Sequence, residues 1–413
     1  MNKLELIIYN FVKDNPLLKQ RIVDIYQGIL GLVPQNAIVT TLPVTERIGY
    51  FYGFHDKTPF SNDGSLLLAH RILSEYRKLK VGEEIEVGIF NGEGWNNYIP
   101  LGNTAGWNWQ MGSMLQWHGD SNNSVVYNNI FNGKHIGIVQ SIHGGIIKQY
   151  RWPVVHVSPN QEFACSYNYL RVEKAMPGYG YVSGDSELGN VSDNYFRIFS
   201  CLDGKTCYKI SLSEIMKISP QPSMEGAFHF FHHALFNPTS NRVFFLHRWL
   251  DKNMRRWTRM FTVAPNGKDL FLFPMDEMVS HITWASSEEI FAYLRYPGLG
   301  EGYFLLQDKS GEGVRYYEDV LNSDGHPTMD KRRGIIITDT YPDRFRNQYL
   351  VLIDIKDGSR KNLVRTHLPK KFKHYLQVDL HPRLHPSCSI ACFDSAHNGK
   401  HSLMTVDYSE YLK

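Results

Sequence analysis

The chain has 413 residues, of which 42% are hydrophobic and 21% are charged. This composition is typical of a folded globular protein and excludes disorder, a collagen-like repeat and a coiled coil. Lys and Arg total 44 against 41 for Asp and Glu, so the net charge of +3 gives no electrostatic reason to expect nucleic acid as a partner. Aromatic residues reach 13%, which favours strands and sugar-facing surfaces over helical bundles.

Apolar residues recur at steps of three and four over residues 3–33, with a break at Asn15-Pro16, so we predict an N-terminal helical segment over 1–34. The segment is amphipathic and carries several basic residues. Two interpretations stay open: packing against the rest of the chain, or peripheral contact with the inner face of a membrane. The basic residues are Lys3, Lys13, Lys19 and Arg21.

After Pro34, short β-branched and aromatic runs alternate with turns rich in Gly, Asn, Asp and Pro. The one helix-like piece is short, around Ser211–Met216. A chain of many evenly spaced short strands is typical of a sandwich, a barrel or a propeller.

An internal repeat decides among these three folds. Each unit has a start position, a large apolar residue three positions later, a polar turn and an apolar strand. The unit starts at residues 57, 114, 154, 233, 281, 326 and 381, a mean step of about 54 residues, close to one four-stranded blade. We therefore predict an all-β fold, a seven-bladed β-propeller over 35–413. The last unit is short, so we expect the strand near 37–42 to complete it and close the ring.

In units four to seven the start position is a histidine, although only 18 of the 413 residues are histidine. Equivalent positions of adjacent blades gather around the axis, so these imidazoles are expected to converge where they could bind Mn, Fe, Zn, Cu or Ni. The alternative is that each ring tethers neighbouring blades. The four residues are His233, His281, His326 and His381.

Other polar side chains lie near the predicted strand starts and ends and are candidates for binding substrate: His55, Lys57, Gln116, His229, Tyr341 and Arg383. Together with Lys57, the residues Arg171 and Arg248 would make a cationic mouth suited to carboxylate-bearing substrates. Each arginine could instead form a structural salt bridge. Four tryptophans could stack on sugars or pack in the core: Trp107, Trp109, Trp117 and Trp249.

Several classes of protein are disfavoured by what the sequence lacks. The five cysteines form no CxxC pair, so neither a disulfide framework nor a thiolate zinc site is expected. The sequence contains no G-x-S-x-G, Walker or HExxH motif, which argues against a serine hydrolase and against a nucleotide partner. No signal peptide and no apolar stretch of 18 residues is found, so we expect a cytoplasmic protein.

Specific segments resemble the oligogalacturonate lyase group of seven-bladed, TolB-like propellers. The resemblance is strongest over about 225–400 and extends more weakly towards the N-terminus, where it is similar to uncharacterised propellers found among bacterial surface-polysaccharide genes. The segments are HFFHHALFNP, FLHRW, VSHITW, DGHPTMD, TDTYPD, DLHPRLHP and CFDSAHNGK, with GFHDKTPFSNDG, WNWQMGSMLQW and MPGYGY in the weaker part.

The resemblance implies a Mn²⁺ ion held by three histidines on successive blades and a glutamine. By motif, the three correspond to His281, His326 and His381, with His233 as a further site residue. The sequence departs from the family at Ser323, which stands where the glutamine is expected. The family's base is an arginine, for which Arg171 and Arg248 are the candidates.

These observations lead to a hypothesis and two alternatives. The hypothesis is a metal-dependent lyase that cleaves a uronate-containing polysaccharide or oligosaccharide by β-elimination, with a base drawn from Arg171, Arg248 and His233. The first alternative is a non-catalytic propeller that binds glycan or protein during surface-polysaccharide biosynthesis. The second is a metal-dependent glycoside hydrolase, for which Asp339 and Asp394 are the only assignable carboxylates.

Overall fold

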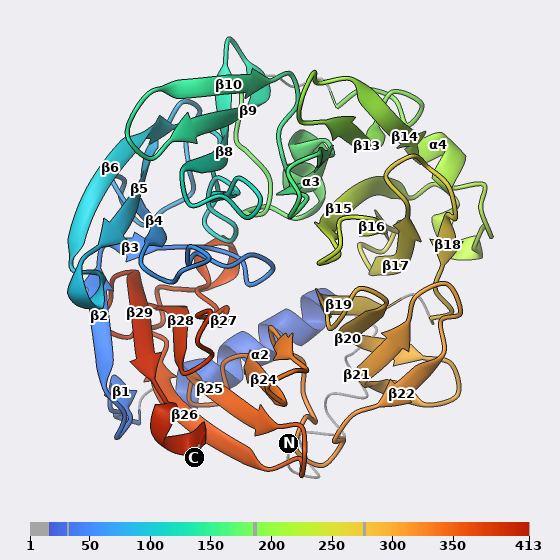
Figure 1. Ribbon diagram of the computed structural model, residues 1–413. Helices are drawn as coiled ribbons and strands as arrows, with labels where there is room; N and C mark the ends of the chain where they lie inside the picture. Colours follow the sequence, from blue (N-terminus) through green and yellow to red (C-terminus); the bar gives the residue numbers. More distant parts are fainter. Residues whose placement is uncertain (1–15, 31–32, 185–187, 276–277, 413) are drawn as a thin grey trace.

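The computed structural model describes residues 16–30, 33–184, 188–275 and 278–412. Over these ranges the chain forms seven antiparallel sheets arranged in a ring (Figure 1). Within each sheet the strands follow one another in chain order, apart from two strands contributed by the N-terminal part of the chain. The seven-bladed propeller predicted from the repeat is confirmed.

The first five blades are simple four-stranded meanders, the form expected when each repeat supplies one whole blade. Their strands are β3 (Tyr50–Phe51), β4 (Leu67–Arg71), β5 (Ile85–Asn91) and β6 (Asn97–Thr104); β7 (Gln116–Trp117), β8 (Ser124–Phe131), β9 (Lys134–Ser141) and β10 (Ile146–Tyr150); β11 (His156–Val157), β12 (Phe163–Ser166), β13 (Tyr195–Ser200) and β14 (Thr206–Ser211); β15 (Phe228–Phe236), β16 (Val243–Leu250), β17 (Arg256–Val263) and β18 (Phe271–Leu272); and β19 (Val279–Trp284), β20 (Glu289–Tyr296), β21 (Gly300–Gln307) and β22 (Gly313–Arg315).

The last two blades are completed by N-terminal strands. Blade six contains β23 (Thr328–Asp330), β24 (Ile335–Asp339), β25 (Asn347–Asp354) and β26 (Arg360–His367), with β1 (Ile38–Val39) added at its outer edge. Blade seven contains β27 (Arg383–Leu384), β28 (Ile390–Ser395) and β29 (Ser402–Asp407), and β2 (Val44–Ile48) is its fourth strand.

The prediction that the strand near 37–42 closes the ring is therefore wrong in its position along the chain. The closing strand comes later, at Val44–Ile48, where Val44 pairs with Val406 and Ile48 with Ser402. The earlier stretch is used instead as an extra edge strand, in which Ile38 pairs with Thr366. Both stretches are rich in β-branched residues, so local propensity alone could not decide which sheet edge each would occupy.

The blades pack face to face, which explains why their middle strands are continuous apolar runs. All eight residues of β16 are buried, and β24 is buried throughout. Each blade buries one face against the preceding blade and the other against the next, so neighbouring repeats share one core. The five cysteines are free thiols.

Helices occupy the N-terminal part of the chain and the connections. The helix α2 (Pro16–Leu30) begins at the predicted break, while α3 (Tyr169–Ala175) lies in the long β12–β13 connection and was not predicted. The helix α4 (Leu212–Ile215) confirms the short piece predicted there, and Ser211 and Glu214 form its capping box. The described ranges also contain the 3₁₀ turns η1 (Glu93–Trp95), η2 (Pro222–Met224), η3 (His374–Leu376) and η4 (Ser409–Leu412).

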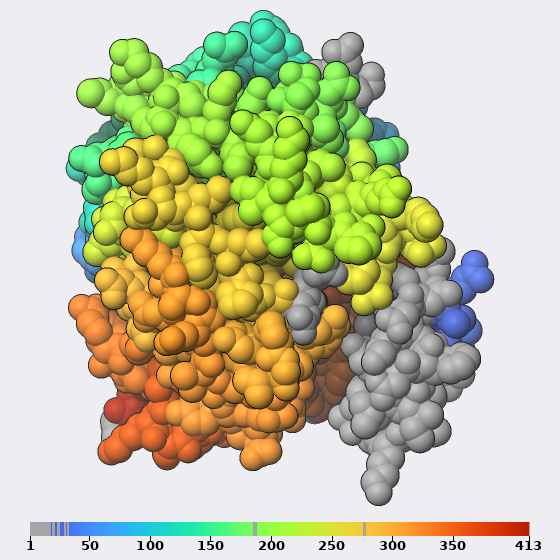
Figure 2. All heavy atoms as spheres, turned by 90° about the vertical axis from the view of Figure 1, so that its right-hand side faces the viewer, coloured from blue at the N-terminus to red at the C-terminus, as the bar shows by residue number. Residues whose placement is uncertain are grey.

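The C-terminal end of α2 is attached to loops of blade six. The Gln27 side chain donates to the Asp343 carbonyl over 3.2 Å and accepts from Arg346 over 2.8 Å. Lys370 donates to the carbonyl of Gly28 over 3.1 Å. Figure 2 shows the described atoms of this helix, in blue, at one side of the ring of blades.

The packing interpretation therefore applies to this end of the segment, whereas residues 3–15, with Lys3 and Lys13, lie outside the described residues. Among the helices that are described, none combines the length and apolar character needed to cross a bilayer.

Candidate metal centre

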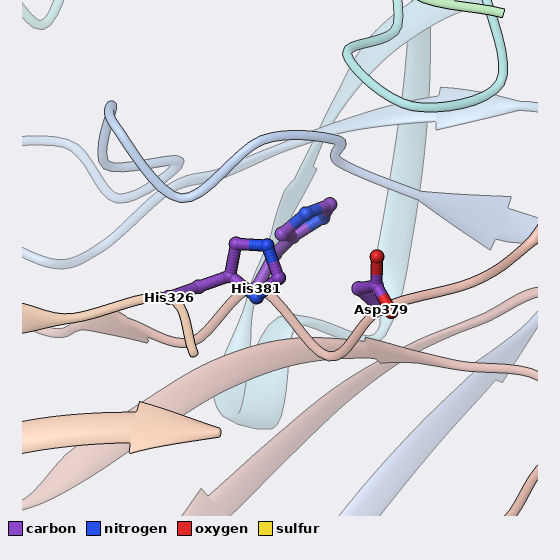
Figure 3. Close-up of side chains that lie close together, drawn as sticks. All are labelled: His326, Asp379 and His381. Atoms are coloured by element: carbon purple, nitrogen blue, oxygen red, sulfur yellow. The ribbon is translucent and has the colours of Figure 1, made fainter. Parts of the chain in front are cut away.

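The three histidines predicted to bind metal lie beside one another. The ring centroids of His281 and His326 are 4.1 Å apart, and those of His326 and His381 are 4.3 Å apart. Asp379 joins them: the ligating atoms of His326, Asp379 and His381 all lie within 4.8 Å of one another (Figure 3). The repeat thus brings equivalent positions of blades five, six and seven together. His326, Asp379 and His381 form a possible metal site, and His281 lies next to it.

Two carboxylates orient two of the rings. Nδ1 of His281 lies 3.0 Å from Oδ1 of Asp324, and Nδ1 of His326 lies 2.8 and 2.9 Å from the two oxygens of Asp339. An ionised carboxylate only accepts hydrogen bonds, so each Nδ1 carries a proton, and in the neutral ring Nε2 keeps its lone pair. A carboxylate behind the imidazole is the usual second partner of a metal-ligating histidine.

The Nε2 atoms of His326 and His381 are buried and have no hydrogen-bond partner among the described residues. Orphaned buried nitrogen atoms cost free energy unless a ligand satisfies them. Imidazole nitrogens with one carboxylate oxygen form a donor set that suits Mn, Fe or Zn. The residues present therefore fit the metal that the resemblance implies.

Asp339 fixes the backbone as well as one ring. Its carboxylate accepts the main-chain N–H of His326 over 2.7 Å and that of His381 over 3.0 Å. Burial alone would raise the pKa of Asp339, but the adjacent His326 more than offsets it and the pKa is lowered. Burial likewise acts to lower the pKa of His326, and Asp339 reverses this effect, so the pKa of His326 is raised.

Asp379 is the ligand candidate that the sequence analysis missed. Burial, with a smaller contribution from Asp339, raises the pKa of Asp379 to about 6 although His326 acts in the opposite direction. Gln377 donates to its carboxylate over 2.8 Å. A signal for it exists in the sequence, because D-x-H-P occurs in both unit six and unit seven and places Asp324 and Asp379 two residues before their histidines. Ser323, where the resemblance expects a glutamine, is exposed.

His55 and Tyr341, predicted to bind substrate, lie next to the cluster. Nδ1 of His55 donates to the carbonyl of Pro327 over 3.1 Å, its Nε2 has no partner in the described chain, and its ring centroid is 5.3 Å from that of His326. The Tyr341 ring is 5.6 Å from His326 and 6.1 Å from His281, and its side chain is partly exposed. Tyr341 therefore lies at the opening of the cluster.

The fourth histidine of the repeat, His233, contacts Phe54, which also contacts the cluster. Its ring stacks on that of Phe54 with centroids 4.5 Å apart, and the centroid of Phe54 is 5.0 Å from that of His381. His233 sits at a register shift in β15 and has a φ of +48°, a left-handed conformation that is strained for a residue with a side chain. Burial lowers the pKa of His233 well below its usual value, so the ring is neutral.

Lys57 and Arg248 were both expected at a cationic mouth. In the structure Lys57 is paired with a carboxylate, whereas Arg248 is not. Lys57 is buried and paired with Asp56 at 2.8 Å. Arg248 is buried beside His232, with Nη1 of the arginine 3.3 Å from Nδ1 of the histidine and 3.5 Å from the sulfur of Met176. Burial and the nearby Arg256 lower the pKa of Arg248 to about 9.

Two predicted site residues have structural partners away from the cluster. Arg171 donates from α3 to the carbonyls of His229 and Gly189, over 2.9 and 3.1 Å, and its role as the base stays a prediction. His229 is buried, with Nδ1 3.0 Å from Nε2 of His247 and Nε2 3.2 Å from the Met224 carbonyl, and its role in binding substrate stays a prediction.

Gln116 has partners for its whole side-chain amide, whereas Arg383 uses only Nη2 and leaves Nε and Nη1 buried without a partner in the described chain. The Gln116 amide donates to the carbonyls of Met114 and Val155 and accepts from the N–H of Val157, so it ties blade two to blade three. Arg383 forms a buried ion pair with Asp394 at 2.8 Å. Both residues thus have structural contacts, and their contacts with substrate stay predictions.

Contacts of this kind also bear on two other expectations, a pair of carboxylates for glycoside hydrolysis and tryptophans that stack on sugars. Asp394 is committed to Arg383 and to the N–H groups of Tyr52 and Gly53, and Asp339 to the histidines, so they are not a free acid/base pair for glycoside hydrolysis. The tryptophans considered as sugar platforms belong to the core, since all are buried: Trp107, Trp109, Trp117 and Trp249.

These observations define a seven-bladed propeller with histidines and a carboxylate gathered at the starts of its innermost strands.

No family model matches the sequence, and a search of curated proteins finds no match. Solved structures do match. An oligogalacturonate lyase in complex with manganese superposes with a TM-score of 0.63 at 12% identity, covering 92% of this chain and 96% of that one. An oligogalacturonate lyase from Vibrio parahaemolyticus superposes with a TM-score of 0.58 at 12% identity, covering 92% of this chain and 100% of that one. The chain therefore has the fold of these lyases.

Proposed function

We propose that the protein is a metal-dependent lyase that cleaves a uronate-containing glycan by β-elimination. The observation that carries the proposal is the cluster of His281, His326, His381 and Asp379, with Asp324 and Asp339 turning two of the rings. One of the similar lyases is a complex with manganese, which supports Mn²⁺ as the metal here. A divalent cation bound by these residues would neutralise the carboxylate of the sugar and so acidify the neighbouring C–H group.

Among the three candidate bases, the surroundings favour His233. An effective base must be unprotonated at neutral pH, and burial keeps the pKa of His233 low and its ring neutral. Arg248 has a pKa of about 9 and is still mostly protonated at neutral pH. In the elimination, His233 takes the proton from the carbon beside the carboxylate, the C–O bond to the next sugar breaks, and its electron pair leaves with that oxygen. A carbon–carbon double bond remains in the product.

Two other residues, one partly exposed and one buried, bind rather than react. Tyr341, partly exposed beside His281 and His326, is placed to contact the sugar that enters. The protonated guanidinium of Arg248 supplies positive charge for an acidic substrate.

Metal content and ultraviolet detection of unsaturated product test this function. Purified protein should contain about one Mn, Fe or Zn per chain, and the His281→Ala/His326→Ala double variant should lose it. His143→Ala, in an exposed turn, is the matched control and should keep the metal. With Mn²⁺ supplied, a panel of uronate oligosaccharides should give unsaturated product. Metal bound without product from any member of the panel would leave the non-catalytic glycan-binding alternative.

A further inference from the structure

Arg248 differs from the other buried arginines that the structure describes. Those arginines meet oxygen acceptors: Arg242 and Arg383 pair with carboxylates, and Arg47, Arg171, Arg259 and Arg346 donate to main-chain carbonyls. Arg383 also leaves Nε and Nη1 without a partner in the described chain, but its charge is paired with Asp394. Arg248 meets only the sulfur of Met176 and the ring nitrogen of His232, and its Nε–H has no partner in the described chain.

His232 also has a buried hydrogen-bond donor without a partner in the described chain. Because a guanidinium only donates, Nδ1 of His232 accepts from Arg248 and the proton of the neutral ring lies on Nε2. That Nε2–H is buried and has no partner among the described residues. Two buried donors, one of them charged, are thus left unsatisfied side by side, which costs free energy in the free protein.

The surroundings of this pair contain positive charge and aromatic rings. Arg256 adds a second cation whose field reaches both Arg248 and His232. The Tyr179 ring is 5.8 Å and the Tyr167 ring 6.1 Å from that of His232. The groups that act most strongly on the pKa of either residue are arginines, tyrosines and His281, with no carboxylate of the described chain among them.

The pair is separate from the metal cluster but adjacent to it. His233 follows His232 directly, with ring centroids 3.9 Å apart, and the Phe54 ring contacts both His233, at 4.5 Å, and His381, at 5.0 Å. A ligand that contacts both places therefore extends past Phe54 and presents an anionic group to Arg248.

We propose that Arg248 and His232 form a carboxylate-binding subsite, distinct from the metal cluster, which takes the acidic group of a uronate sugar. This inference rests on the proposed function only in its choice of a uronate as the sugar. Nε–H of Arg248 and Nε2–H of His232 are the donors, and a carboxylate is the planar acceptor that a guanidinium fits best.

The test uses full-length protein kept free of metal with EDTA, so that it does not depend on the metal cluster. Binding of galacturonate and glucuronate is compared with that of galactose and glucose by calorimetry. The acidic sugars should bind and the neutral ones should not. Arg248→Met should weaken uronate binding about ten- to a hundredfold, since a charged hydrogen-bonding partner is lost. His232→Phe should weaken it several-fold.

Thermal unfolding of the sugar-free variants separates a ligand-binding role from a structural one. Arg248→Met removes an unpaired buried charge, so its melting temperature should stay equal or rise. The matched control is Arg242→Met, which leaves Asp308 buried without its partner and should melt lower while uronate binding is kept. A large fall in melting temperature for Arg248→Met, or equal uronate binding by that variant and wild type, would overturn the subsite.

Different outcomes would refute the lyase function and the carboxylate-binding subsite. If Arg248-dependent uronate binding is found but no uronate oligosaccharide is cleaved with Mn²⁺ present, the lyase function fails and the subsite stands. If unsaturated product forms while Arg248→Met binds uronate as well as wild type, the subsite fails and the lyase function stands.

Discussion

Replacing Asp339 with asparagine tests the positioning of the candidate metal centre. The carboxylate accepts the N–H of His326 at 2.7 Å, its Nδ1–H at 2.8 and 2.9 Å, and the N–H of His381 at 3.0 Å. Asparagine keeps the shape but offers one oxygen and no charge, so at least one of these donors faces an amide N–H₂. A lost hydrogen bond to a charged group is worth about 1.5–3 kcal/mol, and loss of an orienting partner lowers metal affinity about 10- to 100-fold.

We therefore expect Asp339→Asn to lower the free energy of unfolding by about 2–4 kcal/mol and to weaken metal binding by at least about tenfold. Urea unfolding followed by tryptophan fluorescence gives the first quantity, and metal titration gives the second. Asp394→Asn is the matched control, since Asp394 holds the equivalent strand end in blade seven and accepts the N–H groups of Tyr52 and Gly53 at 2.9 and 3.0 Å. The control should lose similar stability and keep its metal affinity. Equal metal affinity in both variants would refute the positioning role.

Three further expectations follow from the fold. Removing residues 1–30 should leave the propeller folded, whereas removing residues 1–48 deletes the closing strand and should abolish cooperative thermal unfolding. Burial lowers the pKa of His70 and His401 from 6.5 to about 3, so the unfolded chain takes up protons first on acidification. Their contribution to stability is complete above pH 6.5 and should be lost at about 1.4 kcal/mol per pH unit for each ring as the pH falls towards about 3. Denaturant unfolding at pH 7 and 4 measures this loss, and equal free energies at the two pH values would contradict it. Ser211→Ala should cost about 1 kcal/mol, measured in the same way, because it removes the cap of α4.

The sequence was sufficient to predict the blades because the repeated units can be aligned with one another. Once the unit is recognised, residues at one slot must occupy one place in each blade, and His281, His326 and His381 are neighbours for that reason. The closing strand could not be predicted in the same way. Residues 37–42 and 44–48 are both rich in β-branched residues, and the choice between two sheet edges depends on contacts with strands more than 300 residues away.

The partners of single side chains could not be predicted from the sequence. Arg171 and Gln116 lie near strand ends, where main-chain carbonyls are within reach and accept hydrogen bonds from both side chains. Asp379 was missed because it precedes the repeated slot by two residues, and only unit six shares that offset, through Asp324. The shared offset would still not have predicted their roles, because the two carboxylates differ. Asp324 orients the ring of His281, whereas Asp379 lies with His326 and His381 in the possible metal site.

The contacts around the cluster run between blades, and this links the site to closure of the ring. Asp324, in the loop entering blade six, orients His281 of blade five, and Asp339 of blade six holds the backbone of His381 at the start of blade seven. His55, from blade one, donates to the carbonyl of Pro327 in blade six. Blade one reaches that position because β2 closes blade seven immediately before it in the chain. The ligands are therefore held by the relative placement of four blades, so any change that loosens closure of the ring must also disperse the donors of the candidate metal centre.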